Sequence, residues 1–398
     1  MTKLLVISEQ MWPEGGGGTL ATHLILKLLA QCGFDILVVS GSRNPTRVKG
    51  IVNIYYPSLK FSNKMRLWTY LTIPFVKSWF TKVIKKTDIV YIPRYCYPLI
   101  PLAKKQSKKV VVHFHDYQPI SYNATVFNNL QKTAFFPSFN EEVKYELFEH
   151  ASILRTLLAP PLTYLNRLSG MWVAKSDNAI CVSRAQADII ACKAPELAEK
   201  IKVIYNPLPN VLYTESKDKN CFLYLGGDSY VKGFHILLSA SRKLLREDIK
   251  AQFLLCGCFK EGNMSFVRKL NETFKGAYRV MGYLEHQKML KLYNISRALI
   301  VPSICEETSS YATIEAMLSG TIPIASKVGG IPEIVQGTYA EKMLFMPGNT
   351  KELIDRMRLI SSFSKEELIN IGRELRQRTL RRFDREKLKD KLLEVFYC

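Results

Sequence analysis

Short runs of aliphatic and β-branched residues alternate with longer helical patterns along most of this 398-residue chain. Such alternation is typical of βαβ units, in which helices cover a parallel sheet that is buried on both faces. The strands expected in the first half are residues 3–8, 36–41, 89–93, 110–115 and 179–183. Those expected in the second half are residues 221–226, 252–257, 278–281, 298–302, 322–327 and 343–346. The pattern therefore predicts an α/β protein with two doubly wound, Rossmann-like parallel sheets.

Two prolines and then a charged run without periodicity separate the two halves, which is typical of a linker between domains. We expect an N-terminal domain over residues 1–207, a linker over 208–220 and a C-terminal domain over 221–380. A last helix is expected over 381–398, and its return to the N-terminal domain stays open. Because ligands bind at the carboxyl ends of parallel strands, the two domains are expected to face a central cleft.

The segment after residues 298–302 carries the strongest chemical signal, because it places two carboxylates around the start of a helix. Glu307 lies in the loop, and Glu315 lies about five residues inside the helix. The first turn of a helix leaves backbone donors unpaired, and these can bind a diphosphate. The donors belong to Ser309, Ser310 and Tyr311. Glu307 is then placed to hold a sugar and Glu315 a ribose, whereas two solvated acids favoured by the helix dipole are the alternative.

The sequence downstream of the two glutamates makes a resemblance to a known family specific. The helix is followed by Gly-Thr-Ile-Pro-Ile-Ala-Ser over 320–326 and by Gly-Gly-Ile-Pro-Glu-Ile over 329–334. This series resembles the signature of the family 4 (group 1) retaining glycosyltransferases of the GT-B fold, and matching stretches cover most of the second half in order. The resemblance implies metal-independent transfer of a sugar from a nucleotide-sugar donor.

The same resemblance implies roles for individual residues. Glu307 would contact the donor sugar and Glu315 the ribose, while a loop after an expected strand would lie near the base. That loop consists of Gly282, Tyr283 and Leu284. The chain departs from the family pattern at Thr308 and Ser310, where Pro and Gly are usual. The loop is therefore expected to turn less tightly than in the family.

A lysine in the loop after residues 221–226 is the candidate cation for the donor phosphates. From this loop the ammonium of Lys232 can neutralise a diphosphate and stabilise the leaving group, whereas a solvated loop lysine is the alternative. The family pattern is Gly-Arg with a downstream Lys-Gly, and here Gly227 occupies the arginine position. Either Arg184 or another basic residue supplies the missing cation, or turnover is weak.

The first half contributes a turn of four consecutive glycines between an expected strand and a helix over 19–31. Glycines let a backbone approach a phosphate or sugar closely, although a flexible turn is the alternative. The family has a Gly-Gly at this junction that faces the donor phosphates. Gly16 and Gly17 match it best.

A histidine also ends the expected strand 110–115, at the edge of the sheet that faces the cleft. An isolated histidine at such a position is often structural. The family carries a histidine here, thought to help bind the donor or the acceptor, and His115 matches it. Asp116 is expected to orient this histidine or to serve the acceptor. The predicted catalytic residues are therefore His115, Lys232 and Glu307.

Neither a metal ion nor a cofactor is expected. The sequence lacks the Asp-x-Asp triplet of metal-dependent glycosyltransferases and any cluster of histidines with carboxylates. Its nine cysteines include no Cys-x-x-Cys, so buried reduced thiols are the better interpretation. The charge of the departing phosphates must then be met by the helix dipole and by Lys232.

The formal charge of +21 is distributed unevenly, with fifteen Lys or Arg and a single acid between residues 42 and 109. This asymmetry favours an anionic partner. Residues 60–86 mix seven of the cations with aromatic side chains, as a helix lying on an anionic membrane surface would. The alternative is a pair of ordinary helices that pack Trp68, Phe75 and Trp79 inward.

Together these features predict a retaining glycosyltransferase that moves a sugar from a nucleotide sugar to a glycan or lipid-linked acceptor at the cytoplasmic membrane face. No apolar stretch reaches the roughly 18 residues of a spanning helix and no signal peptide is evident, so a cytoplasmic, peripheral location is expected. A GT-B sugar-nucleotide epimerase and a non-catalytic binder of nucleotide sugars or nucleic acid stay open. No nucleic-acid recognition motif is evident, so no such partner is expected.

Overall fold

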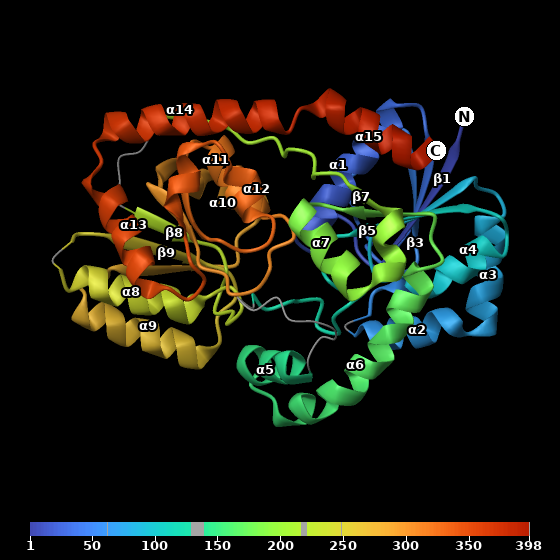
Figure 1. The fold of residues 1–398 in the computed structure, drawn as a ribbon, viewed down its shortest axis with the longest axis horizontal. Coiled ribbons are helices and arrows are strands. Elements are labelled where there is room, and N and C mark those ends of the chain that lie inside the picture. The colour runs from blue at the N-terminus through green and yellow to red at the C-terminus, as the bar shows by residue number, and fades with distance from the viewer. Residues whose placement is uncertain (62, 129–138, 216–220, 248, 398) are drawn as a thin grey trace.

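The computed structural model describes residues 1–61, 63–128, 139–215, 221–247 and 249–397. Within them the chain forms two α/β units that lie side by side, each built around its own parallel sheet (Figure 1). The aliphatic runs form the buried strands, and helices cover both faces of each sheet. The predicted fold class, two doubly wound parallel sheets, is therefore confirmed.

The first sheet has seven parallel strands in the order β3-β2-β1-β4-β5-β6-β7. They are β1 (Lys3–Ser8), β2 (Asp35–Ser40), β3 (Ile51–Tyr55), β4 (Ile89–Ile92), β5 (Lys109–Phe114), β6 (Asn178–Cys181) and β7 (Ile201–Val203). All five strands expected from the sequence are present. The sequence did not predict β3 and β7, because both are partly exposed edge strands without a buried aliphatic run.

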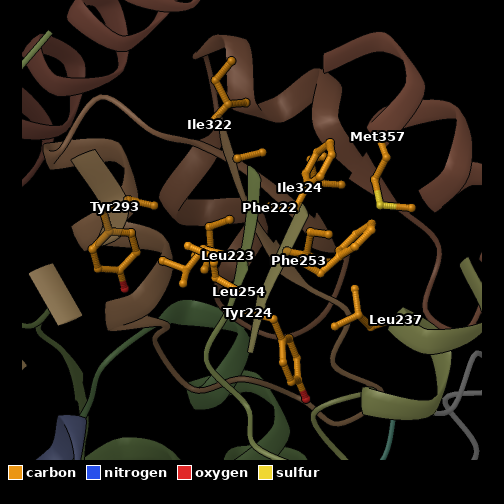
Figure 2. Close-up of a cluster of buried hydrophobic side chains, with 14 of the residues drawn as sticks. Phe222, Leu223, Tyr224, Leu237, Phe253, Leu254, Tyr293, Ile322, Ile324 and Met357 are labelled. Atoms are coloured by element: carbon orange, nitrogen blue, oxygen red, sulfur yellow. The ribbon is translucent and has the colours of Figure 1, made fainter. Parts of the chain in front are cut away.

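The second sheet has six parallel strands in the order β10-β9-β8-β11-β12-β13. They are β8 (Cys221–Tyr224), β9 (Gln252–Cys256), β10 (Tyr278–Gly282), β11 (Ala298–Val301), β12 (Ile322–Ser326) and β13 (Leu344–Phe345). Every strand expected in this half is present. Figure 2 shows the core of this unit, where Phe222, Phe253 and Ile324 from the sheet lie close to Met357 of a covering helix.

Helices connect and cover the strands in both units. Those of the first unit are α1 (Gly17–Gln31), α2 (Lys64–Thr72), α3 (Pro74–Ile84), α4 (Ile100–Lys104), α5 (Phe139–His150), α6 (Ile153–Val173) and α7 (Arg184–Lys193). The second unit has α8 (Phe234–Leu245), α9 (Glu261–Thr273), α10 (His286–Ile295), α11 (Tyr311–Leu318), α12 (Ile331–Val335), α13 (Thr350–Ser362) and α14 (Lys365–Arg382). Helices α5 and α6 project from the body of the molecule near the junction of the units (Figure 1).

The last helix, α15 (Arg385–Tyr397), crosses back to the first unit and lies beside α1 (Figure 1). Its buried side chains Leu392 and Phe396 share a core cluster with Leu4 of β1 and Ile25 of α1. It begins at Arg385 rather than at the expected residue 381, because α14 extends to Arg382. The proposed domain boundaries remain predictions, and residues 216–220 of the expected linker lie outside the described residues.

The basic aromatic stretch forms α2 and α3, with a break immediately before Pro74. Trp68 is buried and Trp79 is partly buried, whereas Phe75 is 80% exposed. Inward packing of all three aromatic rings is therefore wrong for Phe75. Among the described residues, no helix combines the length and the apolar character needed to cross a membrane.

Candidate active site between the two sheets

A pocket of about 410 Å³ lies between the two units, and we call it the cleft pocket. Its walls come from the loops that follow β5, β8 and β11 and from α5, so it lies at the carboxyl ends of the strands, as expected for an open parallel sheet. Its lining includes the polar and titratable side chains of His115, Asp116, Tyr117, Tyr145, Glu149, Lys232, Cys305, Glu306 and Glu307. All three predicted catalytic residues therefore lie around one pocket, although their roles remain predictions.

Lys232 and Glu307 form an ion pair at this pocket. The ammonium lies 2.8 Å and 3.0 Å from the two carboxylate oxygens of Glu307, and Ser303 Oγ donates to Oε1 at 2.6 Å. Burial opposes charge on both side chains, but their mutual attraction outweighs it. The pKa of Lys232 is therefore raised and the pKa of Glu307 is lowered from their ordinary values. Both groups are charged at neutral pH.

This ion pair predicts a pH-dependent contribution to stability. Because the folded pKa of Glu307 lies below the ordinary value of 4.5, the stabilisation is fully present above pH 4.5 and is lost as the pH falls through the lowered pKa. We expect the intact chain to resist urea more than Glu307→Gln at about pH 7, with a difference that shrinks toward about pH 3. Urea unfolding across this range measures the effect. A difference that stays constant would contradict it.

His115 follows β5 directly and lies at the glycine-rich turn of α1. Its Nε2 is 3.2 Å from Thr22 Oγ1, and its backbone carbonyl accepts a hydrogen bond from Thr308 Oγ1 of the second unit. Burial, then the neighbouring His113 and Arg94, hold the pKa of His115 well below its ordinary value. The ring is therefore neutral at physiological pH and is oriented by Thr22.

Asp116 also lines the cleft pocket, and its carboxylate is hydrogen-bonded to residues of the first unit. One oxygen accepts from Tyr95 OH at 2.8 Å and the other from the backbone N–H of Gln118 at 3.0 Å. Within the described residues, these bonds anchor Asp116 to the first unit, and Thr22 rather than Asp116 contacts the ring of His115. A role for Asp116 toward the acceptor remains a prediction.

Glu315 lies in α11, away from the cleft pocket, and is only 2% exposed. His286 Nε2 is 2.6 Å from its Oε1, and Tyr293 OH donates to its Oε2 at 3.1 Å. The ring of Trp12, from the first unit, packs edge-on against His286 at 5.2 Å between centroids. Solvated acids are therefore the wrong interpretation of this glutamate. Its two partners on α10 were not predicted, because only tertiary packing brings them to α11.

The start of α11 meets the start of α1 across the interface. The side chain of Ser310 caps the helix by accepting from the backbone N–H of Thr313, and Tyr311 OH donates to the carbonyl of Pro207. A Cβ at Gly17 would lie 3.1 Å from the Tyr311 ring, and one at Gly18 would lie 2.9 Å from His115.

The four consecutive glycines differ in how closely other protein atoms pack against them. A Cβ at Gly16 would meet nothing within 4 Å. The packing is tightest at Gly15, where a Cβ would lie 2.8 Å from the Thr19 side chain, and at Gly18. The roles of Gly16 and Gly17 toward the donor phosphates stay predictions. The backbone donors of Ser309 and Ser310 have no acceptor among the described parts of the chain, which leaves them available to an anion.

The loop after β10 lies beside the residues that hold Glu315. Gly282 ends the strand with a φ of +68°, Tyr283 is 74% exposed and Leu284 packs against the core. His286, which contacts Glu315, follows two residues later. The three predicted base-binding residues are therefore close in the chain to His286, the residue that contacts the predicted ribose-binding glutamate.

Gly227 lies where the backbone leaves no room for a side chain. Its φ is +59°, and a Cβ there would lie 2.5 Å from the carbonyl oxygen of Cys258. The proposed substitute, Arg184, does not line the cleft pocket; its backbone N–H donates to Glu333. Lys232 is the one lysine or arginine among the described residues that line this pocket.

Two further glutamates join the units and were not predicted. Glu306 accepts from Asn128 Nδ2 at 2.8 Å. Glu333 accepts from the first two backbone N–H groups of α7, at 3.0 Å and 2.7 Å, and from Tyr205 OH at 2.9 Å. A carboxylate at a helix start is favourable. Glu333 was part of the family motif, but no local pattern indicated that its partner would be the start of α7.

Comparison with known proteins gives two family matches that together extend over most of the chain. Residues 15–209 match the model described as Glycosyltransferase Family 4, and residues 213–377 match the one described as Glycosyl transferases group 1. The O-antigen chain mannosyltransferase RfbU of Salmonella typhimurium is 25% identical, over 67% of this chain and 70% of that protein. The sulfoquinovosyl transferase SQD2 of Arabidopsis thaliana is 23% identical, over 70% of this chain.

The chain spans about half the length of the first curated relatives it matches, with 45% of the uncharacterized glycosyltransferase MJ1607 of Methanocaldococcus jannaschii and 50% of SQD2 covered. Solved structures match over nearly all of both chains. Anabaena HepE in complex with UDP-glucose superposes with a TM-score of 0.68 at 18% identity, covering 99% of each chain. Sucrose-phosphate synthase from Thermosynechococcus elongatus gives 0.72 at 16% identity, covering 100% of this chain and 98% of the other. The two parallel-sheet units are thus those of the GT-B fold, and the chain belongs to the group 1, family 4 glycosyltransferases.

Proposed function

We propose that the protein is a retaining glycosyltransferase that moves a sugar from a nucleotide diphosphate donor to a glycan or lipid-linked acceptor. The observation that carries the proposal is the cleft pocket, where an ion-paired lysine and glutamate face a neutral histidine across the two units. Family membership supports a nucleotide-sugar donor. The HepE structure in complex with UDP-glucose makes a uridine diphosphate sugar the first donor to test.

In this proposal the second unit holds the donor. The diphosphate lies at the backbone donors before α11, with Lys232 beside it, and Glu315 binds the ribose near the Gly282–Leu284 loop. Glu307 contacts the sugar. The bond between the anomeric carbon and the phosphate oxygen breaks, and the acceptor oxygen forms the new bond on the same face of the sugar. The departing phosphate takes the acceptor's proton, while Lys232 and the helix dipole offset its charge.

His115 and Asp116 lie on the acceptor side of the pocket in this arrangement. Because His115 is neutral, it can donate or accept a hydrogen bond without adding charge. No step requires a metal ion or a cofactor, and we propose none. We place the reaction at the inner face of a membrane, on the basis of the basic helices α2 and α3 and the exposed Phe75.

The donor site is tested by a thermal-shift screen of nucleotide sugars, repeated with Glu315→Ala. A true donor raises the unfolding midpoint by mass action. We expect the substitution to weaken donor binding by about tenfold, because it removes hydrogen bonds to a charged group. Glu272→Ala, an exposed glutamate on α9, is the matched control and should leave the donor-induced increment unchanged.

The comparison uses the increase in unfolding midpoint that the donor causes in each variant, rather than the midpoint itself. Glu315→Ala also leaves His286 and Tyr293 without their acceptor, which lowers the midpoint whether or not the donor binds. An increment unchanged by Glu315→Ala would contradict the donor site. Release of nucleoside diphosphate only when an acceptor is supplied distinguishes transfer from epimerisation. Donor binding without release across an acceptor panel would instead identify a non-catalytic binder.

A further inference from the structure

A pocket of about 680 Å³ lies on the second unit, between α14 and the turn that follows α12. We call it the α14 pocket. It shares no lining residue with the cleft pocket among the described residues. Its charged lining consists of four arginines and one glutamate: Arg373, Arg378, Arg381, Arg382 and Glu374. The pocket is therefore a separate and strongly cationic site.

The charged residues of this pocket lie on one face of α14. Glu374, Arg378 and Arg382 follow one another at intervals of four residues. Arg373 and Arg381 belong to a neighbouring row with the same kind of spacing. Side chains three or four residues apart in a helix lie on the same face, so the two rows together form a continuous polar wall.

Two of the four guanidinium groups are neutralised by carboxylates. Arg373 donates to the two oxygens of Glu215 at 2.7 Å and 2.9 Å. Arg378 Nε lies 2.6 Å from Oε1 of Glu374, whose Oε2 accepts from the backbone N–H of Tyr339. The single glutamate of the lining is therefore already engaged by an arginine and by the backbone.

The other two guanidinium groups have no carboxylate partner among the described residues. Arg382 donates to the backbone carbonyls of Glu333 and Ile334, which are neutral acceptors. Arg381 has no side-chain partner in the described parts of the chain. Two neighbouring positive charges at the end of α14 are therefore left without an opposite charge.

Two uncompensated guanidinium groups favour a ligand with two negative charges. Guanidinium groups bind phosphate oxygens in a bidentate geometry, and a phosphate monoester is mostly dianionic above its second pKa of about 6. Three side-chain amides of the lining can donate to and accept from the polar part of such a ligand. They belong to Gln336, Asn370 and Gln377.

The α14 pocket continues into a neighbouring pocket of about 630 Å³, with which it shares Gly337, Asn370 and Glu374. The lining of this neighbour adds the partly buried side chains of Tyr339 and Ile371. An apolar surface therefore lies directly beside the cationic one. The organic part of a phosphate monoester has room there while its phosphate contacts the arginines.

We infer that the α14 pocket binds a small phosphate monoester, with its phosphate on Arg381 and Arg382 and its organic part toward Tyr339. Sugar phosphates and nucleoside monophosphates share this chemistry. The inference does not depend on the proposed function, because no residue of the cleft pocket takes part. The site lies at the end of α14, immediately before the chain crosses to α15 beside the first unit (Figure 1).

Calorimetric titration of the full chain at low ionic strength tests the inference. The ligands are inorganic phosphate, a panel of sugar phosphates and nucleoside monophosphates, and the parent sugars and nucleosides that lack the phosphate. We expect at least one monoester to bind about tenfold or more tightly than its parent compound. Its affinity should fall between about pH 7 and about pH 5, because the phosphate takes up its second proton near pH 6.

Two substitutions in the pocket should change this affinity in opposite directions. Arg381→Gln should weaken the monoester by about tenfold, since it removes a charged donor. Glu374→Gln should strengthen it several-fold, because it removes the negative charge of the lining and releases Arg378. Arg246→Gln is the matched control and should change nothing, since Arg246 is an exposed arginine at the end of α8.

Hydrogen–deuterium exchange locates the bound monoester. We expect it to slow exchange at residues 336–337 and 377–382. Protection confined to the residues that line the cleft pocket would place the phosphate at the donor site and overturn the inference. Equal weakening by Arg381→Gln and Arg246→Gln would assign binding to the overall charge of the protein instead. Binding of duplex RNA without binding of any monoester would also overturn the inference.

Discussion

Lys232→Met is expected to lower nucleoside diphosphate release by about 10²–10³-fold, with a much smaller effect on donor binding. Lys232 is the one lysine or arginine among the described residues that line the cleft pocket. Charge on the leaving phosphate grows as the glycosidic bond breaks, so a fixed cation stabilises the transition state more than the bound donor. The loss should therefore fall mainly on kcat. Assays at saturating donor, with and without acceptor, measure it.

Removing Lys232 also leaves the carboxylate of Glu307 without its partner, and this effect must be separated from the loss of the cation. The double variant Lys232→Met with Glu307→Gln removes both charges and should stay as slow as the single variant. Lys351→Met is the matched control, because Lys351 is an exposed lysine on α13 that does not line the cleft pocket. A Lys232→Met protein with near-normal kcat would assign the lysine a purely structural role.

The buried strands and the loop motifs could be predicted from the sequence because each is encoded by neighbouring residues. Apolar runs such as those of β8 and β11 are buried completely or almost completely, and such runs predict strands within a covered sheet. Glu307 and Lys232 could be identified because each lies in a short loop after a strand. Their ion pair could not, since 75 residues separate them.

The remaining site features depend on contacts between units, which leave no local pattern. In the sequence, Glu333 is indistinguishable from an ordinary acidic residue at a helix start. Only the fold brings its carboxylate to the backbone N–H groups of α7. A Cβ at Gly18 would meet the side chain of His115, whereas one at Gly16 would meet nothing within 4 Å, and a run of identical residues cannot show this difference. The spacing of residues in the sequence predicts helices, strands and short motifs. The residues that meet across the interface between the two units can be identified only from the folded structure.

Gly227→Arg is expected to destabilise the protein by about 2–4 kcal/mol and to lower turnover, although it restores the arginine of the family pattern. The backbone at Gly227 has a φ of +59°, which costs a non-glycine residue about 1 kcal/mol. A Cβ would lie 2.5 Å from the Cys258 carbonyl oxygen, and the resulting overpacking costs about 1–3 kcal/mol more. The loop around Gly227 would therefore have to move. Because Lys232 follows five residues later, this movement would displace its ammonium group and lower turnover.

Urea unfolding and nucleotide release together measure this outcome. Gly262→Arg is the matched control, because it introduces the same charge on α9 where a Cβ would meet nothing within 4 Å. The control should keep its unfolding midpoint and its turnover. If Gly227→Arg instead kept its stability and turned over faster, the 226–228 loop would adapt readily, and the protein would simply lack a second phosphate cation. A loss in both measurements means that the glycine is built into the packing of this loop on Gly257 and Cys258, so any second cation must come from elsewhere in the fold.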